Sequence, residues 1–99
     1  MYRSVSMYPK SADQAAVEEH VKQVAVAFAK SPGFLSCTTS VDTLMGPGAR
    51  VSDVGRVVIV DFESLDDALN ALGSESFREI GEVGESLTSM HYLFECREV

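Results

Sequence analysis

The sequence contains no tryptophan, only two cysteines and few basic residues, and each shortage narrows the functions open to it. Cys37 and Cys96 are too few for a disulfide framework, and no residue spacing suggests a metal site. Fifteen acidic and eight basic residues give a net charge of −7, which argues against nucleic acid or an anionic membrane as the main partner. No apolar run approaches the roughly 18 residues of a membrane span. The first residues lack an apolar signal-peptide core, so we expect a cytoplasmic protein.

The most informative stretch covers residues 57–69, within a chain whose 99 residues we interpret as a single domain, 1–99. Four consecutive β-branched residues, 57–60, favour a strand that is covered on both faces. Ser64 then has the character of a helix N-cap, and Asp67 lies where a capping box places its acidic residue. A buried strand therefore passes directly into a capped helix.

Periodicity and turn residues divide the remaining chain into strands and helices. Strands are predicted for residues 2–8, 34–45, 55–62 and 89–98, helices for residues 12–30 and 64–72, a hairpin loop for 46–53, and a second helical piece after Gly73. This βαββαβ order is typical of the ferredoxin-like α+β fold. We expect a four-stranded antiparallel sheet in the order 4-1-3-2 with the helices on one face.

The apolar spacing of each helix predicts which side chains face the sheet. The first helix should bury a stripe made of Val17, Val21, Val24 and Phe28, with His20 at its exposed flank. The second should bury Leu65, Ala68, Leu69 and Leu72, and the last piece Phe77, Ile80, Gly84 and Leu87. Gly81 and Gly84 each weaken the last piece by about 1 kcal/mol.

The third strand offers apolar residues to both faces of the sheet, although the helices cover only one. Val58, Val60 and Phe62 point one way, and Val57 and Ile59 point the other, where Val5, Leu93 and either Phe34 or Leu35 can join them. An exposed apolar sheet face of this size would favour aggregation. We therefore expect a homodimer in which two sheets stack into a dimeric α+β barrel. Cys37 and Cys96 would then lie at opposite sheet edges, too far apart to form a disulfide within one subunit.

Several polar and aromatic side chains are candidates for a site. If the face with Val57 and Ile59 lines the barrel, polar groups would meet there, from His91, Asp61, Glu95 and Arg3. A histidine beside a carboxylate can exchange a proton near neutral pH, although the same set can instead be an ion-pair network that fixes the dimer. Five aromatic residues can line a helix–sheet cleft or simply belong to the core: Tyr2, Tyr8, Phe62, Phe77 and Tyr92.

Three segments resemble the antibiotic-biosynthesis-monooxygenase family of dimeric α+β barrels, namely residues 32–35, 58–68 and 74–77. EthD-like proteins of the same superfamily are similar. The resemblance implies oxidation of aromatic polyketides or quinols without metal or flavin, or haem degradation, in a cleft between helices and sheet. Typical members have a tryptophan and a histidine where this chain has Phe62 and Ala71, so only Phe62 is carried over, as an aromatic pocket wall.

Two hypotheses follow from these residues and this resemblance. The first is a cofactor-independent monooxygenase-like protein that acts on a small aromatic or polyketide-type molecule, with His91 as the candidate catalytic residue and no cofactor or metal. The alternative is a non-catalytic dimeric barrel that binds a small hydrophobic ligand or serves as a stress-associated accessory. The candidate substrate-binding residues are Tyr2, Phe62, Phe77 and Tyr92.

Overall fold

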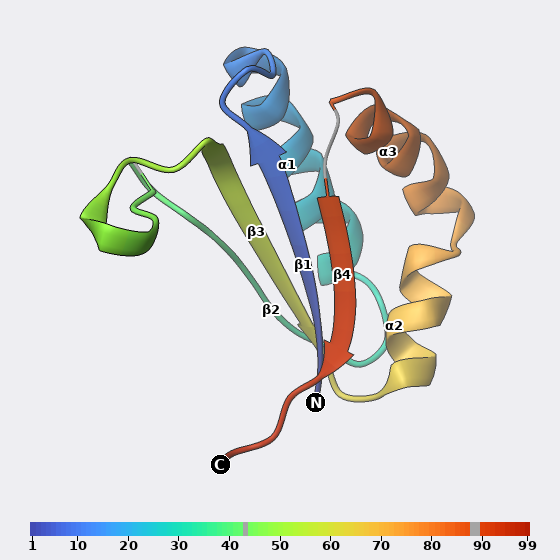
Figure 1. Cartoon of the computed structure of the whole chain (residues 1–99). Coiled ribbons are helices and arrows are strands. Elements are labelled where there is room, and N and C mark those ends of the chain that lie inside the picture. The colour runs from blue at the N-terminus through green and yellow to red at the C-terminus, as the bar shows by residue number, and fades with distance from the viewer. Residues whose placement is uncertain (43, 88–89) are drawn as a thin grey trace.

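The computed structural model describes residues 1–42, 44–87 and 90–99, and it shows one antiparallel sheet with helices on one side (Figure 1). The strands are β1 (Tyr2–Pro9), β2 (Phe34–Thr39), β3 (Val54–Phe62) and β4 (Met90–Glu95), in the order β2-β3-β1-β4. The helices are α1 (Gln14–Ala29), α2 (Leu65–Leu72) and α3 (Glu75–Ser86). The predicted ferredoxin-like fold and strand order are confirmed. Thr43 and Ser89, which were assigned to the second and fourth strands, lie outside the described residues.

Strand β3 lies in the interior of the sheet and organises both faces. Val60 is opposite Ser4 of β1 on one side and opposite Cys37 of β2 on the other. Val58, Val60 and Phe62 are buried on the helix side. The run of β-branched residues therefore belongs to an interior strand, which pairs along both edges, and within one subunit the helices cover only one of its two faces.

Helix α1 packs its predicted stripe onto this sheet. The Asp13 carboxylate accepts hydrogen bonds from the backbone N–H groups of Ala15 and Ala16 and so caps the helix. All four predicted stripe residues are buried, but His20 is buried with them. The expectation that His20 lies on an exposed flank is wrong, because it lies three residues after Val17 and four before Val24 and shares their face.

Helices α2 and α3 are two separate helices on either side of Gly73, as the sequence indicated. Ser64 caps α2 by accepting a hydrogen bond from the N–H of Asp67 at 3.1 Å. The inward face of α2 differs from the prediction, since Leu65 and Leu69 are exposed while Ala68 and Ala71 are buried. This helix contacts β1, β3 and α3, and small side chains on its inner face permit that close packing.

A β-bulge in β2 and the register of β4 decide which side chains meet the helices. The β2 register shifts between Phe34 and Ser36, so that both Phe34 and Cys37 lie against the helix-side core. Leu93 pairs with Ser4 and also packs against this core. The expectation that Leu93 joins the open face is therefore wrong, and since strand residues alternate, His91 follows Leu93 to the helix side.

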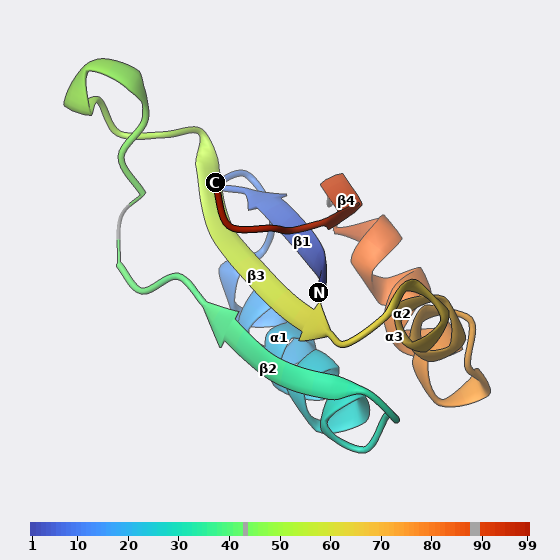
Figure 2. The same ribbon diagram turned by 90° about the horizontal axis from the view of Figure 1, so that it is seen from below.

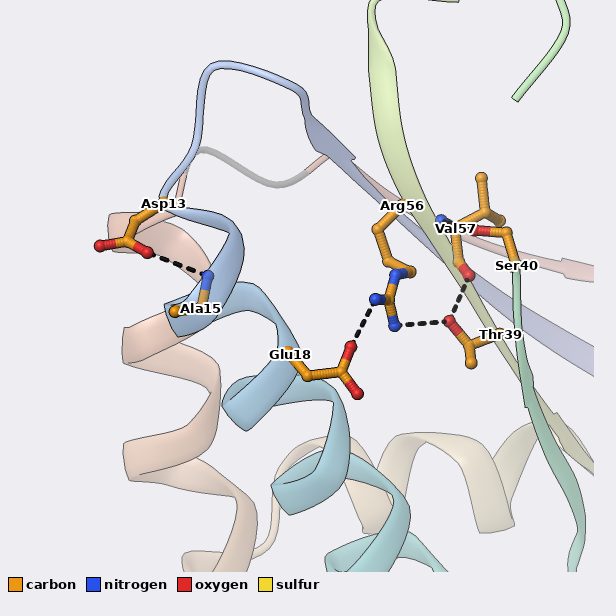
Figure 3. A network of polar contacts seen from close by, with 7 residues as sticks. All are labelled: Asp13, Ala15, Glu18, Thr39, Ser40, Arg56 and Val57. Carbon is orange, nitrogen blue, oxygen red and sulfur yellow. Dashed lines mark hydrogen bonds and ion pairs between the residues drawn. The ribbon is translucent and has the colours of Figure 1, made fainter. Parts of the chain in front are cut away.

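A polar network ties α1 to the paired strands β2 and β3 (Figure 3). The Arg56 guanidinium forms an ion pair with Glu18 and donates a weak hydrogen bond to Thr39 Oγ1 at 3.4 Å. Thr39 Oγ1 in turn donates to the carbonyl oxygen of Val57 at 3.0 Å. Arg56 therefore connects the helix to the sheet.

The face of the sheet opposite the helices is open within one subunit. Exposed apolar side chains lie along its β4 edge, namely Met90, Tyr92 and Phe94. Arg3 and Asp61 form a bidentate ion pair there, with N–O distances of 2.9 and 3.0 Å. None of the helices among the described residues is long and apolar enough to cross a membrane.

Candidate active site between the sheet and helices α1 and α3

A cavity of about 320 Å³ lies between the helix side of the sheet and helices α1 and α3. Its apolar walls come from both layers: Val24, Phe28, Val58, Val60, Leu72 and Phe77. Its polar lining on the sheet and on α1 consists of Ser4, Ser6, Tyr8, His20 and His91. The cavity therefore combines an apolar body with a short row of polar groups, as small-molecule sites commonly do.

Small residues keep this space open. Ser4 and Ser6 are adjacent inward positions of β1, and Gly81 and Gly84 line the cavity from α3. A Cβ added at Gly81 would meet only the Phe77 ring, at 3.4 Å or more. The glycines that weaken α3 as a helix therefore also leave room beneath it.

His91 is the first of two histidines on the cavity wall. Its Nε2 lies 2.7 Å from the Oγ of Ser4, and Ser4 itself is buried. The His91 residue as a whole is exposed, on the edge strand of the sheet. Desolvation of the imidazole lowers the pKa of His91 below its ordinary value of 6.5, so the ring is neutral at pH 7.

His20 is the second histidine, and it is almost completely buried. Its Nε2 lies 2.9 Å from the hydroxyl oxygen of Tyr8, and the two rings meet edge to face at 5.5 Å between centroids. Burial lowers the pKa of His20 and raises that of Tyr8. At neutral pH both groups are therefore uncharged. Nδ1 of His20 has no hydrogen-bond partner among the described residues.

The two histidines give the cavity groups that can accept a proton. A neutral imidazole can accept a proton, and each ring is held through Nε2 by a hydroxyl group that can donate or accept a hydrogen bond. Apolar side chains form much of the surrounding wall, and a low local dielectric strengthens polar interactions. Such an arrangement can bind a largely apolar molecule that carries a hydroxyl or carbonyl group and can remove a proton from it.

Charged side chains of α3 form the rim of the cavity. Arg78 and Glu82 are one helical turn apart, with their closest nitrogen and oxygen atoms at 4.0 Å, and both are well exposed. An exposed pair of this kind contributes little to stability. In the parts of the chain that the structure describes, no group of three His, Cys, Asp or Glu residues is arranged to hold a metal ion.

Only some of the residues predicted for the site line the cavity. His91 and Phe77 line the cavity, and Phe77 stacks on Phe28 with centroids 4.5 Å apart. Tyr2 and Phe62 are paired neighbours in the adjacent core and do not form the cavity wall. The expectation that Tyr92 lines the cleft is wrong, because it projects from the open face and is 53% exposed.

The proposed polar grouping of His91 with Arg3 and Asp61 is also wrong. Arg3 and Asp61 are paired with each other on the open face, whereas His91 pairs with Ser4 on the helix side. His20 and Ser4 were missed as site residues. Helical spacing with Val17 and Val24 could have placed His20 inward, but nothing in the sequence indicated that Tyr8 would lie beneath it.

The fold and the cavity together define a ferredoxin-like α+β protein with a candidate small-molecule site between its sheet and its helices. No protein-family model matches the sequence, and a search of curated protein sequences finds no match. Similarity appears instead among solved structures.

The chain is similar in structure to SnoaB, a cofactor-independent oxygenase from Streptomyces nogalater. The match has a TM-score of 0.77 and 25% identity, and it covers 99% of this chain and 94% of that one. An ethyl tert-butyl ether degradation (EthD) family protein from Bacillus halodurans matches with a TM-score of 0.75 and 14% identity, over 98% and 99% of the two chains. A dimeric ferredoxin-like protein of unknown function from Thermobifida fusca matches with a TM-score of 0.69 and 12% identity, over 96% and 90%.

These structures share one architecture over nearly their whole length with this chain. Antibiotic-biosynthesis-monooxygenase-type proteins are among the further similar structures. The predicted resemblance to the antibiotic-biosynthesis-monooxygenase-like and EthD-like proteins is therefore confirmed at the level of the fold.

Proposed function

We propose that this protein is a cofactor-independent oxygenase that acts on a small phenol- or enol-bearing aromatic molecule of the polyketide type. The observation that carries the proposal is the pairing of two neutral histidines with hydroxyl groups inside one mostly apolar cavity. The structural similarity to SnoaB, at 25% identity, supports the same class of reaction.

The proposed chemistry begins with a proton transfer to His91. A neutral imidazole takes the acidic proton of the bound substrate and leaves an electron-rich enolate or phenolate. This anion transfers one electron to O2, and the resulting radical pair combines to form the C–O bond of a peroxide. His91 returns its proton to the outer peroxide oxygen. The O–O bond then breaks as the second proton of the methylene carbon is removed to form the C=O bond, and the departing hydroxide takes up this proton and leaves as water. A methylene carbon thus becomes a carbonyl by a four-electron oxidation, balanced by the four-electron reduction of O2.

The other cavity residues bind and orient the substrate. Phe77 and Phe28, which already stack on each other, offer an aromatic surface for a planar ring. Tyr8, held by His20, is placed to hydrogen-bond a carbonyl or hydroxyl at the buried end. Ser4 holds the His91 ring through Nε2 and sets its orientation toward the cavity.

The proposed active form is a homodimer. The open sheet face exposes Tyr92, Phe94 and Met90 to solvent in one subunit, and a second copy stacked on this face would cover them. Stable interfaces of this kind bury about 800 Å² on each partner. The dimeric state of the similar protein from Thermobifida fusca supports this assembly.

Oxygen consumption tests the proposed reaction directly. The purified protein is incubated with anthrone-like and quinol substrates under O2, without added cofactor, while oxygen uptake and product mass are followed. Turnover that disappears in His91→Gln and persists in the control Val26→Ala, a change on the exposed surface of α1, would support the oxygenase. Ligand binding without turnover across the panel would instead support the non-catalytic ligand-binding barrel.

A further inference from the structure

The hairpin between β2 and β3 extends away from the body of the protein and ends in a short helical turn, Pro47–Ala49. We call residues 44–52 the arm. Its two sides are joined by hydrogen bonds from Gly46 N to Arg50 O at 2.6 Å and from Ser52 N to Leu44 O at 2.8 Å. The arm is therefore a formed structural element, although it protrudes from the core (Figures 1 and 2).

The arm carries an exposed apolar pair. Met45 and Val51 form an antiparallel bridge and are 59% and 56% exposed. Bridge partners present their side chains on the same side of the hairpin, so the two together form one small apolar surface. Neither residue belongs to the hydrophobic core or to the residues packed against it. Apolar groups on a protruding element commonly mark an interaction site.

Two residues at the tip of the arm have a left-handed backbone conformation. Ala49 has a φ of 57°, in the left-handed region that L-residues other than glycine rarely adopt. Beside it, Gly48 has a φ of 70° and open space around its Cα. A tip fixed in this way before binding loses less conformational entropy when a partner covers it.

The position of the arm indicates which partner it meets. In both views the arm lies on the side of the sheet away from α2 and α3, which is the side of the open face (Figures 1 and 2). The open face carries its own exposed apolar side chains, including Tyr92 and Phe94. A second copy that covers this face would also come within reach of the arm. A similar fold is described as dimeric, which favours a second copy over an unrelated protein.

We propose that the arm of each subunit closes over the second copy of the chain, with Met45 and Val51 packed against its surface. This inference rests on the homodimer in the proposed function and adds a second contact region beyond the stacked sheets. The two-fold symmetry of a homodimer makes the contact reciprocal, so each interface contains two arms. Four apolar side chains per dimer leave water through this contact.

Dimer dissociation measured by sedimentation over a dilution series tests the role of the arm. The double variant Met45→Ser, Val51→Ser should weaken dimerisation by about tenfold or more, since apolar side chains lose their burial. The control Val26→Ser removes a similarly exposed apolar side chain, 61% exposed, from the helical surface and should leave the dissociation constant unchanged. Circular dichroism confirms that both variants remain folded.

The possible outcomes distinguish the proposed arm contact from the formation of the homodimer. If Tyr92→Ser with Phe94→Ser weakens the dimer while the arm variant does not, the arm contact is overturned and the homodimer stands. If the unmodified protein is a monomer at micromolar concentration, both are overturned. A photoreactive residue at position 51 gives an independent readout, because the proposed contact requires crosslinks between subunits, and crosslinks confined to one chain would contradict it.

Discussion

Ser4 and His91 come from opposite ends of the chain, yet Oγ of Ser4 and Nε2 of His91 lie 2.7 Å apart across neighbouring strands. The bond exists because the pairing of β1 with β4 places both side chains on the helix side of the sheet. It brings a histidine to the wall of a cavity whose other polar pair, Tyr8 and His20, is buried deeper. The proposed reaction depends on this placement.

The first prediction concerns His91 as the proposed base. His91→Gln should lower the turnover rate by about 10²–10⁴-fold, the usual contribution of a general base, while substrate affinity changes much less. In the unmodified protein, the rate should fall as pH drops through the pKa of His91, which burial places below 6.5. A pH–rate profile measured by oxygen uptake checks both effects. A profile that is unchanged in the variant would exclude His91 as the base.

The positions of these residues show what the sequence could and could not predict. Asp13, Ser64 and the stripe from Val17 to Phe28 were predictable because capping and helical spacing are local. The orientation of β4 was not, because Tyr92 and Phe94 are more apolar than His91 and Leu93 and therefore favour the wrong inward face. Both faces of the sheet carry apolar side chains, so alternation alone does not identify the covered one.

A second prediction concerns His20 and stability. Its pKa is lower in the folded state than the ordinary value of 6.5, so the unfolded chain binds the proton more readily. The stabilisation is complete above pH 6.5 and is lost progressively as pH falls below it. His20→Leu should make the unfolding free energy less dependent on pH between 7.5 and 5, as measured by urea denaturation. Tyr8→Phe serves as a companion variant. It removes the hydroxyl partner of His20 but keeps His20 itself, which can still titrate.

A third prediction concerns Gly33, which follows α1 with a φ of 75°. A Cβ at this position would lie 2.0 Å from Oδ2 of Asp67, the residue whose N–H is capped by Ser64. Gly33→Ala should therefore destabilise the protein by about 1–3 kcal/mol or more, through both backbone strain and a clash. Gly48→Ala is the matched control, because Gly48 has a φ of 70° but no atom within 4 Å of the added Cβ. Equal losses in the two variants would show that the contact with Asp67 relaxes freely.

The last prediction concerns Gly81 and distinguishes effects on the stability of the fold from effects on ligand binding in the cavity. Gly81→Ala adds a methyl group that meets only the Phe77 ring at ordinary contact distance. The change should stabilise α3 by up to about 1 kcal/mol, because alanine is a much better helix former than glycine. Gly81→Leu should retain the fold but fill part of the 320 Å³ cavity, so that ligand binding and turnover decrease together. Thermal denaturation and isothermal titration measure the two effects separately. A leucine variant that still binds and oxidises substrate normally would place the substrate site elsewhere, because a side chain at position 81 projects into the proposed cavity.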